Sequence, residues 1–171
     1  SRAEAGMVQR IGWADSADGI RFERATSEPI VADGRWYQKW TPGYGYDEAW
    51  RDPFVFLHDD GRWHMLVTAR AKGVDIKHSG IIGHAGSDDL DHWEVLPPLT
   101  GPSSFGQLEV CQSRMIDGRH VLVFSCGSDM QAEPGPGGVW IAEGAGALGP
   151  WDIDRARHVR PEHLYAGQVL R

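Results

Sequence analysis

The sequence lacks the features of several common protein classes. No apolar stretch approaches the roughly 20 residues that a membrane-spanning helix needs, so we expect no membrane partner. The net charge of −7 comes without any basic patch, and this argues against a nucleic-acid partner. No secretory signal pattern is visible, and the cellular location stays open, with the cytoplasm slightly favoured.

Several catalytic and ligand-binding patterns are also missing. There is no nucleophile elbow and no phosphate-binding glycine loop. The 8 histidines show no metal-ligand spacing, so the sequence predicts neither a metal nor another cofactor. Cysteine is scarce, with only Cys111 and Cys126. A disulfide between neighbouring strands is one interpretation, but two buried thiols are favoured, because free cysteine is among the most buried residue types.

No long helical pattern is present, and turn-forming residues are frequent. The 22 glycines and 10 prolines are typical of a turn-rich all-β chain. The segment Asp60-Gly61-Arg62 recurs as Asp117-Gly118-Arg119, an offset of 57 residues. Asp-Gly is a hairpin-turn signal, and the apolar runs on either side of each copy predict strands.

A second pair of segments repeats outside these hairpins. Ile11–Ser16 matches Ile82–Ser87, so each unit reads as four short strands. Such a unit is typical of a β-propeller blade. The alternative is a generic β-meander whose Asp-Gly turns coincide by chance.

The repeats divide the chain into parts of a propeller. We expect the outer strands of one blade at 8–35, full blades at 51–97 and 106–154, and the inner strand of a further blade at 164–171. Because propellers close with about four to eight blades, these roughly three blades predict a piece of a larger propeller. The other interpretation is a small protein that completes its propeller by self-association.

Two carboxylates fall at matching places in the repeat. Carried back from the turn, the offset of 57 residues relates Asp52 to Glu109, each at the start of an inner strand. Inner strands line the central channel of a propeller, so their starts converge. Paired carboxylates in one pocket are the groups that hydrolyse glycosides, and like charges raise one pKa, as a general acid requires. The plainer interpretations are an Asp52 paired with Arg51 and a solvated channel Glu109.

An aromatic segment leads directly into Arg51-Asp52. We expect it at the rim of the same pocket, where aromatic faces bind sugar rings, with Trp50 as a substrate-binding candidate. The alternative is a loop packed on itself. The aromatic residues are Trp36, Tyr37, Trp40, Tyr44, Tyr46 and Trp50.

Four motifs follow one another along the chain: Trp50-Arg51-Asp52-Pro53, Leu90-Asp91-His92-Trp93-Glu94, Leu108-Glu109-Val110-Cys111 and Leu164-Tyr165-Ala166. In this order they resemble the motifs of the invertases, fructanases and levansucrases, the five-bladed propeller glycoside hydrolases of family thirty-two and its relatives. The resemblance implies retaining hydrolysis of β-fructofuranosides, with a carbohydrate as substrate.

The resemblance also implies individual roles. Glu109 would be the general acid/base and Asp52 the transition-state stabiliser, while Arg51 and Tyr165 would contact the sugar. The Asp nucleophile of such enzymes lies on the first blade and is not in this sequence, so this piece alone is expected to be inactive.

One motif departs from the family pattern. Val110 separates Glu109 from Cys111, where typical members have Glu directly before Cys. This puts the fructoside preference in question. The alternatives are an arabinofuranosidase- or xylosidase-like propeller glycosidase and a non-catalytic carbohydrate-binding propeller.

Overall fold

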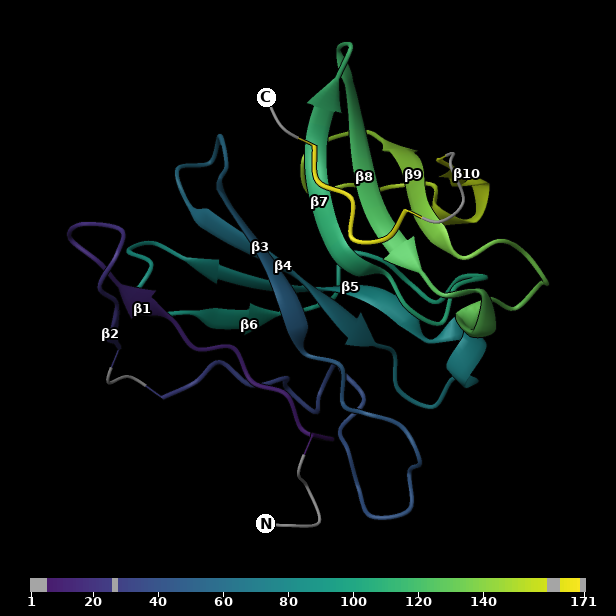
Figure 1. The fold of residues 1–171 in the computed structure, drawn as a ribbon, viewed down its shortest axis with the longest axis horizontal. Coiled ribbons are helices and arrows are strands. Elements are labelled where there is room, and N and C mark those ends of the chain that lie inside the picture. The colour runs from purple at the N-terminus through teal and green to yellow at the C-terminus, as the bar shows by residue number, and fades with distance from the viewer. Residues whose placement is uncertain (1–5, 26–27, 160–163, 170–171) are drawn as a thin grey trace.

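The computed structural model describes residues 6–25, 28–159 and 164–169. Within them the chain is all-β, with short 3₁₀ turns and no α-helix, as predicted. Two four-stranded antiparallel sheets and one two-stranded ribbon make up the fold (Figure 1). No helix in these ranges has the length and hydrophobicity to cross a lipid bilayer.

Each four-stranded sheet is a simple meander whose strands pair in chain order. The first sheet contains β3 (Arg51–Leu57), β4 (Trp63–Arg70), β5 (Gly80–Ser87) and β6 (Glu94–Leu96). The second contains β7 (Glu109–Ile116), β8 (Arg119–Cys126), β9 (Gly138–Gly144) and β10 (Arg157–His158). The 3₁₀ turns are η2 (Ile76–His78), η3 (Ser128–Met130) and η4 (Ile153–Arg155).

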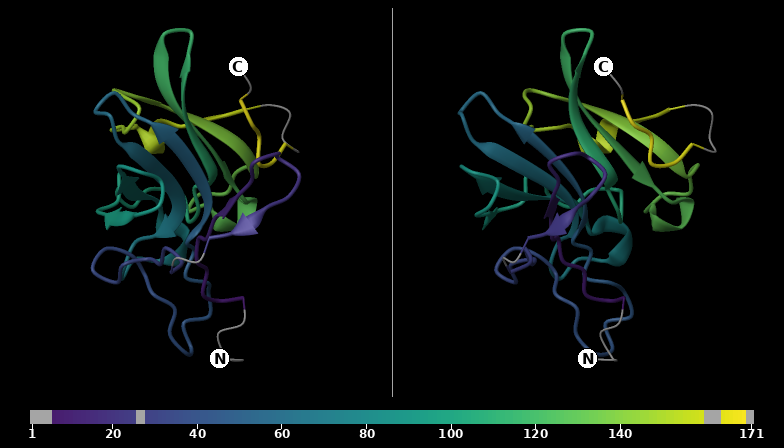
Figure 2. Two further views of the ribbon diagram at one scale, coloured as in Figure 1. Left: turned by 90° about the vertical axis from the view of Figure 1, so that its left-hand side faces the viewer. Right: turned by 60° about the vertical axis from the view of Figure 1, so that its left-hand side comes forward.

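The N-terminal segment forms a small ribbon beside the first sheet. It consists of β1 (Ala14–Asp15) and β2 (Glu23–Arg24), and an isolated bridge joins Ile11 to Ile30. Figure 2 shows the two large sheets as separate layers, with this N-terminal segment running along the first.

The first sheet is covered on both faces. Alternate residues of a strand point to opposite sides of its sheet. Accordingly, Leu66 of β4 joins a hydrophobic cluster with Leu108 and Phe124 of the second sheet, whereas Val67 joins a cluster with Ile11 and Ile30. The N-terminal segment and the second sheet therefore enclose the first sheet between two cores.

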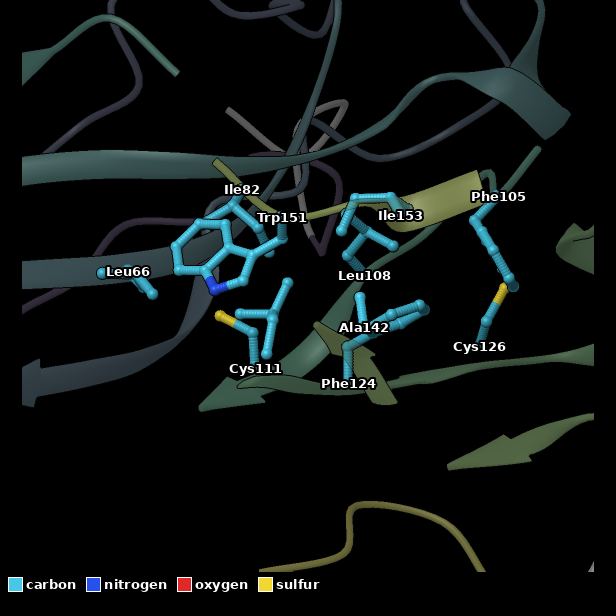
Figure 3. Packing of buried hydrophobic residues seen from close by; sticks show 11 residues of the cluster. Leu66, Ile82, Phe105, Leu108, Cys111, Phe124, Cys126, Ala142, Trp151 and Ile153 are labelled. Atoms are coloured by element: carbon cyan, nitrogen blue, oxygen red, sulfur yellow. The ribbon is translucent and has the colours of Figure 1, made fainter. Parts of the chain in front are cut away.

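The core between the two large sheets contains both cysteines (Figure 3). Cys111 and Cys126 are buried free thiols, which confirms the favoured interpretation. Burial raises the pKa of each thiol to about 12.

A glycine lets the two sheets meet closely beside the candidate site. A Cβ at Gly80 would lie 2.6 Å from the backbone nitrogen of Gln107. Any larger residue would push the start of β5 away from the segment that precedes β7.

Two expected strands differ in the structure. In the blade expected at 106–154, the segment after β9 contributes only one bridge, between Gly144 and Trp151, and the paired outer strand is β10, beyond the expected end of the blade. The reason is that Trp151 turns into the core and its ring fills the space beside Gly144, where a Cβ would lie 2.3 Å from Trp151 Cδ1.

The inner strand expected at 164–171 is not formed in its described part, 164–169. Residues 170–171 lie outside the described residues. The backbone of this segment forms hydrogen bonds with side chains instead of with the backbone of a neighbouring strand. Gln112 Nε2 donates to Gly167 O at 2.7 Å, and Val169 N donates to Gln112 Oε1 at 3.2 Å. The segment nevertheless lies along β7, where an inner strand would be.

Candidate active site

Both inner strands begin with a β-bulge. The regular pairing resumes only at the fourth residue of β3, which starts at Arg51, and of β7, which starts at Glu109. The second residues of these strands, Asp52 and Val110, have φ values of 55° and 50°. This left-handed conformation is uncommon outside glycine and costs on the order of 1–3 kcal/mol. Bulges re-aim side chains, so both strands turn their first residues out of the regular pleat.

The structural match between the two strands corrects the one expected from the sequence. Arg51 lies opposite Thr68 of β4, and Glu109 lies opposite the corresponding Ser125 of β8. Arg51 and Glu109 therefore share what we call the leading position. The expected equivalence of Asp52 with Glu109 was wrong by one residue, since Asp52 occupies the second position.

The two hairpins explain this shift. Five residues separate the paired Leu57 and Trp63, whereas four separate the paired Met115 and His120. The offset between the sheets is thus 57 residues from the hairpin onward but 58 along the inner strands. An offset read from the Asp-Gly turn and carried back through the hairpin misses this single residue.

The third repeat supplies Tyr165 at the leading position and Ala166 at the second. Ala166 has a φ of 53°, like Asp52 and Val110. Its backbone nitrogen donates to Ser125 Oγ at 2.9 Å, which anchors the segment to β8. The three repeats thus share one backbone feature, although the third forms no regular strand.

The three leading-position side chains converge on Glu109. Arg51 Nη2 donates to Glu109 Oε1, and the Tyr165 hydroxyl donates to Glu109 Oε2. Charge-assisted hydrogen bonds of this kind are stronger than neutral ones. Burial first, and then the bond to Glu109, raises the pKa of Tyr165, so its phenol keeps its proton and acts as a donor. The carboxylate is therefore fixed from both sides, with its side chain 16% exposed.

Asp52 joins the two sheets. Its Oδ2 accepts hydrogen bonds from Thr68 Oγ1 at 3.0 Å and from the Val110 backbone nitrogen at 3.4 Å. Arg51 Nε lies 3.6 Å from the same oxygen. Within the described ranges, no donor reaches Asp52 Oδ1, which leaves one carboxylate oxygen for a ligand.

Asp47, which no sequence motif marks, connects two arginines. It binds Arg51 at 2.5 Å and the buried Arg70 at 2.7 Å. Burial alone would raise the pKa of Asp47, but Arg70 and Arg51 outweigh it and lower that pKa. Burial likewise opposes the charge of Arg51, yet Glu109, Asp47 and Asp52 raise its pKa overall. Three carboxylates and two guanidinium groups thus alternate in one network.

Gln107 is a further contributor that the sequence did not reveal. With its amide oxygen turned toward the arginines, it accepts from Arg51 at 3.1 Å and from Arg70 at 3.2 Å. Arg70 also donates to Gly106 O at 3.0 Å. The segment before β7 is therefore fastened to β4. The bracing roles of Asp47, Arg70 and Gln107 follow no local motif, because Arg70 contacts Asp47 and Gly106 at separations of 23 and 36 residues along the chain.

Trp50 does not lie with these residues. Its side chain is 0% exposed and packs against Tyr37 at a ring-centroid distance of 4.9 Å, in the core beneath the N-terminal segment. It therefore has no face free to stack on a sugar. The aromatic loop divides in the same way, since Tyr37 and Trp50 are buried while Trp36 and Tyr46 are 38% and 44% exposed.

The comparisons with known proteins agree with this architecture. Residues 2–143 match the family model of the glycosyl hydrolases family 32 N-terminal domain. The chain belongs to glycosyl hydrolase family 32. No curated protein matches its sequence.

Solved structures of related enzymes share the fold of this family 32 chain. The levansucrase from Gluconacetobacter diazotrophicus has a TM-score of 0.64 at 19% identity, over 84% of this chain and 37% of that one. The inulosucrase from Halalkalicoccus jeotgali bound to kestose has a TM-score of 0.63 at 20% identity, over 82% of this chain and 39% of that one. The full-length β-fructofuranosidase from Microbacterium saccharophilum K-1 has a TM-score of 0.61 at 20% identity, over 82% of this chain and 33% of that one.

The family 32 chain spans about two fifths or less of the length of these structures. It is a partial β-propeller, as the sequence predicted. The site described above lies at the starts of its inner strands.

Proposed function

We propose that the protein containing this chain hydrolyses β-fructofuranosides with retention of configuration. The observation that carries the proposal is the convergence of the leading positions, where Arg51 and Tyr165 fix the Glu109 carboxylate beside Asp52. The family membership supports the glycosidase class. The names of the structural neighbours, which include a levansucrase and a β-fructofuranosidase, support fructofuranosides as the substrate class.

Glu109 is proposed as the general acid/base. Each carboxyl oxygen of Glu109 has two lone-pair sites, so the group can carry a proton on a free one and direct it at the leaving-group oxygen while it accepts from Arg51 and Tyr165. It would protonate the glycosidic oxygen as the bond to the fructosyl carbon breaks. In the second step it would take a proton from the water that releases the sugar.

Asp52 is proposed as the residue that stabilises the transition state. Its Oδ2 is held by Thr68 and by the backbone of Val110, which leaves Oδ1 to accept hydrogen bonds from sugar hydroxyls. A fixed anion beside a sugar that develops positive charge lowers the barrier electrostatically. Arg51 positions both acids. The retaining mechanism also needs a nucleophilic carboxylate, which we assign to the protein outside this chain.

The test is a Glu109→Gln variant of the full-length protein, assayed with sucrose, inulin and levan. We expect kcat to fall by about 10²–10⁴-fold, because proton transfer to the leaving group is lost, while substrate affinity is kept. The control is Glu94→Gln, an exposed carboxylate on β6. Unchanged turnover in Glu109→Gln contradicts the role of Glu109.

Aryl arabinofuranosides and xylosides in the same assay separate the substrate classes. Turnover of these alone would assign the protein to the arabinofuranosidase-like alternative. Binding of a fructan without any turnover would assign it to the carbohydrate-binding alternative.

A further inference from the structure

Three metal-ligand side chains meet at the hairpin between β3 and β4. His58 and Asp60 belong to the loop, and His64 is the second residue of β4. One ligand atom from each lies within 4.8 Å of the other two. The group is far from the candidate active site, because the seven residues of β3 at about 3.3 Å each place it roughly 20 Å away. The sequence spacing predicted no metal site because it does not show how the hairpin folds these residues together.

The distances fit a small tetrahedral ion. His58 Nδ1 lies 3.3 Å from Asp60 Oδ1, and His64 Nε2 lies 3.1 Å from Asp60 Oδ2. Ligands bound tetrahedrally at about 2.0–2.1 Å from zinc are roughly 3.3 Å apart. The separation of His64 Nε2 from Asp60 Oδ2 thus already matches, whereas His58 Nδ1 lies beside the other oxygen of the same carboxylate. His58 lies in the loop and can move toward His64.

The second ring nitrogen of His64 has a hydrogen-bond partner in the neighbouring strand. Its Nδ1 lies 2.8 Å from Nε2 of the buried His84 on β5. When the proton between these nitrogens resides on His64, its Nε2 lone pair faces Asp60 and is available to a metal. A hydrogen bond from the second ring nitrogen fixes the orientation of a ligating imidazole. In the other tautomer, His64 Nε2–H donates to Asp60 instead.

The surroundings are closed on one side and open on the other. The His64 side chain is only 5% exposed and lies against the Phe56 ring, whereas His58 and Asp60 are 27% and 44% exposed. Asp60 is also positioned by the Arg62 backbone nitrogen, which donates to Oδ1 at 2.9 Å. His58 lines a groove between the hairpin ends of the two sheets, and Asp60 is exposed, so water can reach these two side chains.

We propose that His58, Asp60 and His64 bind one divalent transition-metal ion of the zinc class, with water as the fourth ligand. Two imidazoles and a carboxylate suit Zn²⁺ and Co²⁺, whereas Mg²⁺ and Ca²⁺ require oxygen ligands. The ion joins the loop to β4, and His84 extends this connection to β5. Its role is to stabilise the blade, independently of the proposed catalysis.

The binding test uses the full-length protein without a histidine tag, stripped with EDTA and titrated with ZnCl₂ by calorimetry. We expect one Zn²⁺ per chain and no heat with MgCl₂. Substituted Co²⁺ should give the visible absorption of a four-coordinate site. At Zn²⁺ concentrations of 100 times Kd, the melting temperature should rise by about 5–10 °C, because the ion binds only the folded hairpin.

Variants identify the ligands. His58→Ala and Asp60→Asn, both in the loop, should each weaken Zn²⁺ binding by roughly tenfold or more. The matched control is His92→Ala, because His92 forms a similar exposed pair with Asp89 at 2.8 Å in the turn before β6. It should bind Zn²⁺ like the wild type. Circular dichroism confirms that each variant is folded. Absence of stoichiometric Zn²⁺ binding by the wild type, or binding that survives both loop variants, overturns the proposal.

Discussion

The two large sheets share one backbone plan and differ in the chemistry placed on it. Each is a four-stranded meander whose inner strand begins with a bulge. In the first sheet the leading and second positions are Arg51 and Asp52, and in the second they are Glu109 and Val110. The bulge is therefore an architectural device that aims residues at one point. The residue types, and not the backbone, distinguish the cationic leading position of the first sheet from the acidic leading position of the second.

The two proposed catalytic acids are also held in different ways. Glu109 is fixed by the leading residues of the repeats before and after it, Arg51 and Tyr165. Asp52 is fixed by Thr68 of its own sheet and by the backbone of the next. Both acids depend on contacts between neighbouring repeats. The geometry of the site is thus a property of how the sheets pack.

Within the first sheet, the largest effect is expected at the second position. In the full-length protein, Asp52→Asn should lower kcat/KM for sucrose by about 10²–10³-fold, because the fixed negative charge beside the transition state is lost. The amide oxygen can still accept from Thr68, so folding should be unaffected. Steady-state kinetics and a thermal melt measure the two effects. A loss of less than tenfold would contradict the proposed role of Asp52, and with it the functional difference between the second positions of the two sheets.

A smaller effect, on stability, is expected from the network that braces both leading positions. Asp47→Asn leaves the buried Arg70 without its charged partner and should cost about 2–3 kcal/mol at pH 7. The pKa of Asp47 is lowered in the folded chain, so its contribution is complete above the unfolded pKa of about 3.9. It is lost as the pH falls through the lower folded pKa. Urea unfolding should therefore show the variant and wild type converging below about pH 4.

The control for this variant is Asp88→Asn. Asp88 pairs with Arg62 at 2.8 Å, but its side chain is 79% exposed. An exposed pair contributes about 0–1 kcal/mol. Equal losses in the two variants would show that the Asp47 network is no more than a surface ion pair.

Tyr165→Phe tests whether the third repeat belongs to the same set. It removes the hydroxyl that donates to Glu109 and leaves the ring in place. We expect kcat to fall by about tenfold in the full-length protein, the loss of one hydrogen bond to a charged group. An unchanged kcat in Tyr165→Phe would separate Tyr165 from Glu109.

The smallest effect is expected at Val110. Its left-handed backbone is unfavourable for a β-branched residue, and glycine removes that strain while it removes a half-buried side chain. Val110→Gly should therefore change the free energy of unfolding by less than about 1 kcal/mol. Val121→Gly, in the buried middle of β8, should cost about 3 kcal/mol. Similar losses in both variants would mean that the second position carries no strain.

The repeat and the strands of the hairpins could be predicted from the sequence, whereas the catalytic roles of Asp52 and Glu109 stay predictions. Asp-Gly turns and alternating apolar runs are local signals, and they indicate the meanders directly. The predicted equivalence of Asp52 with Glu109 was wrong because the β7–β8 hairpin is one residue shorter than the β3–β4 hairpin. A constant offset does not show this difference. Asp47, Arg70 and Gln107 were missed because their contacts are made only when the sheets pack.

Trp50 was wrongly expected in the pocket because of its sequence neighbours. Its position beside Arg51 favours a place in the pocket, but successive residues of a chain point to different sides. The side chain of Trp50 fits against Gly83 in the core, where a Cβ on that glycine would lie 2.8 Å from the indole. Trp50 therefore faces the core, whereas the adjacent Arg51 faces the candidate site.

The most direct test of the proposed division of roles varies the leaving group. In the full-length protein, kcat/KM of Glu109→Ala and Asp52→Asn is compared for sucrose and for an aryl β-fructofuranoside whose phenolate leaves without protonation. If Glu109 is the acid, Glu109→Ala should lose about 10²-fold or more on sucrose beyond its loss on the aryl substrate, whereas Asp52→Asn should lose equally on both. Equal losses on both substrates in Glu109→Ala would contradict the account.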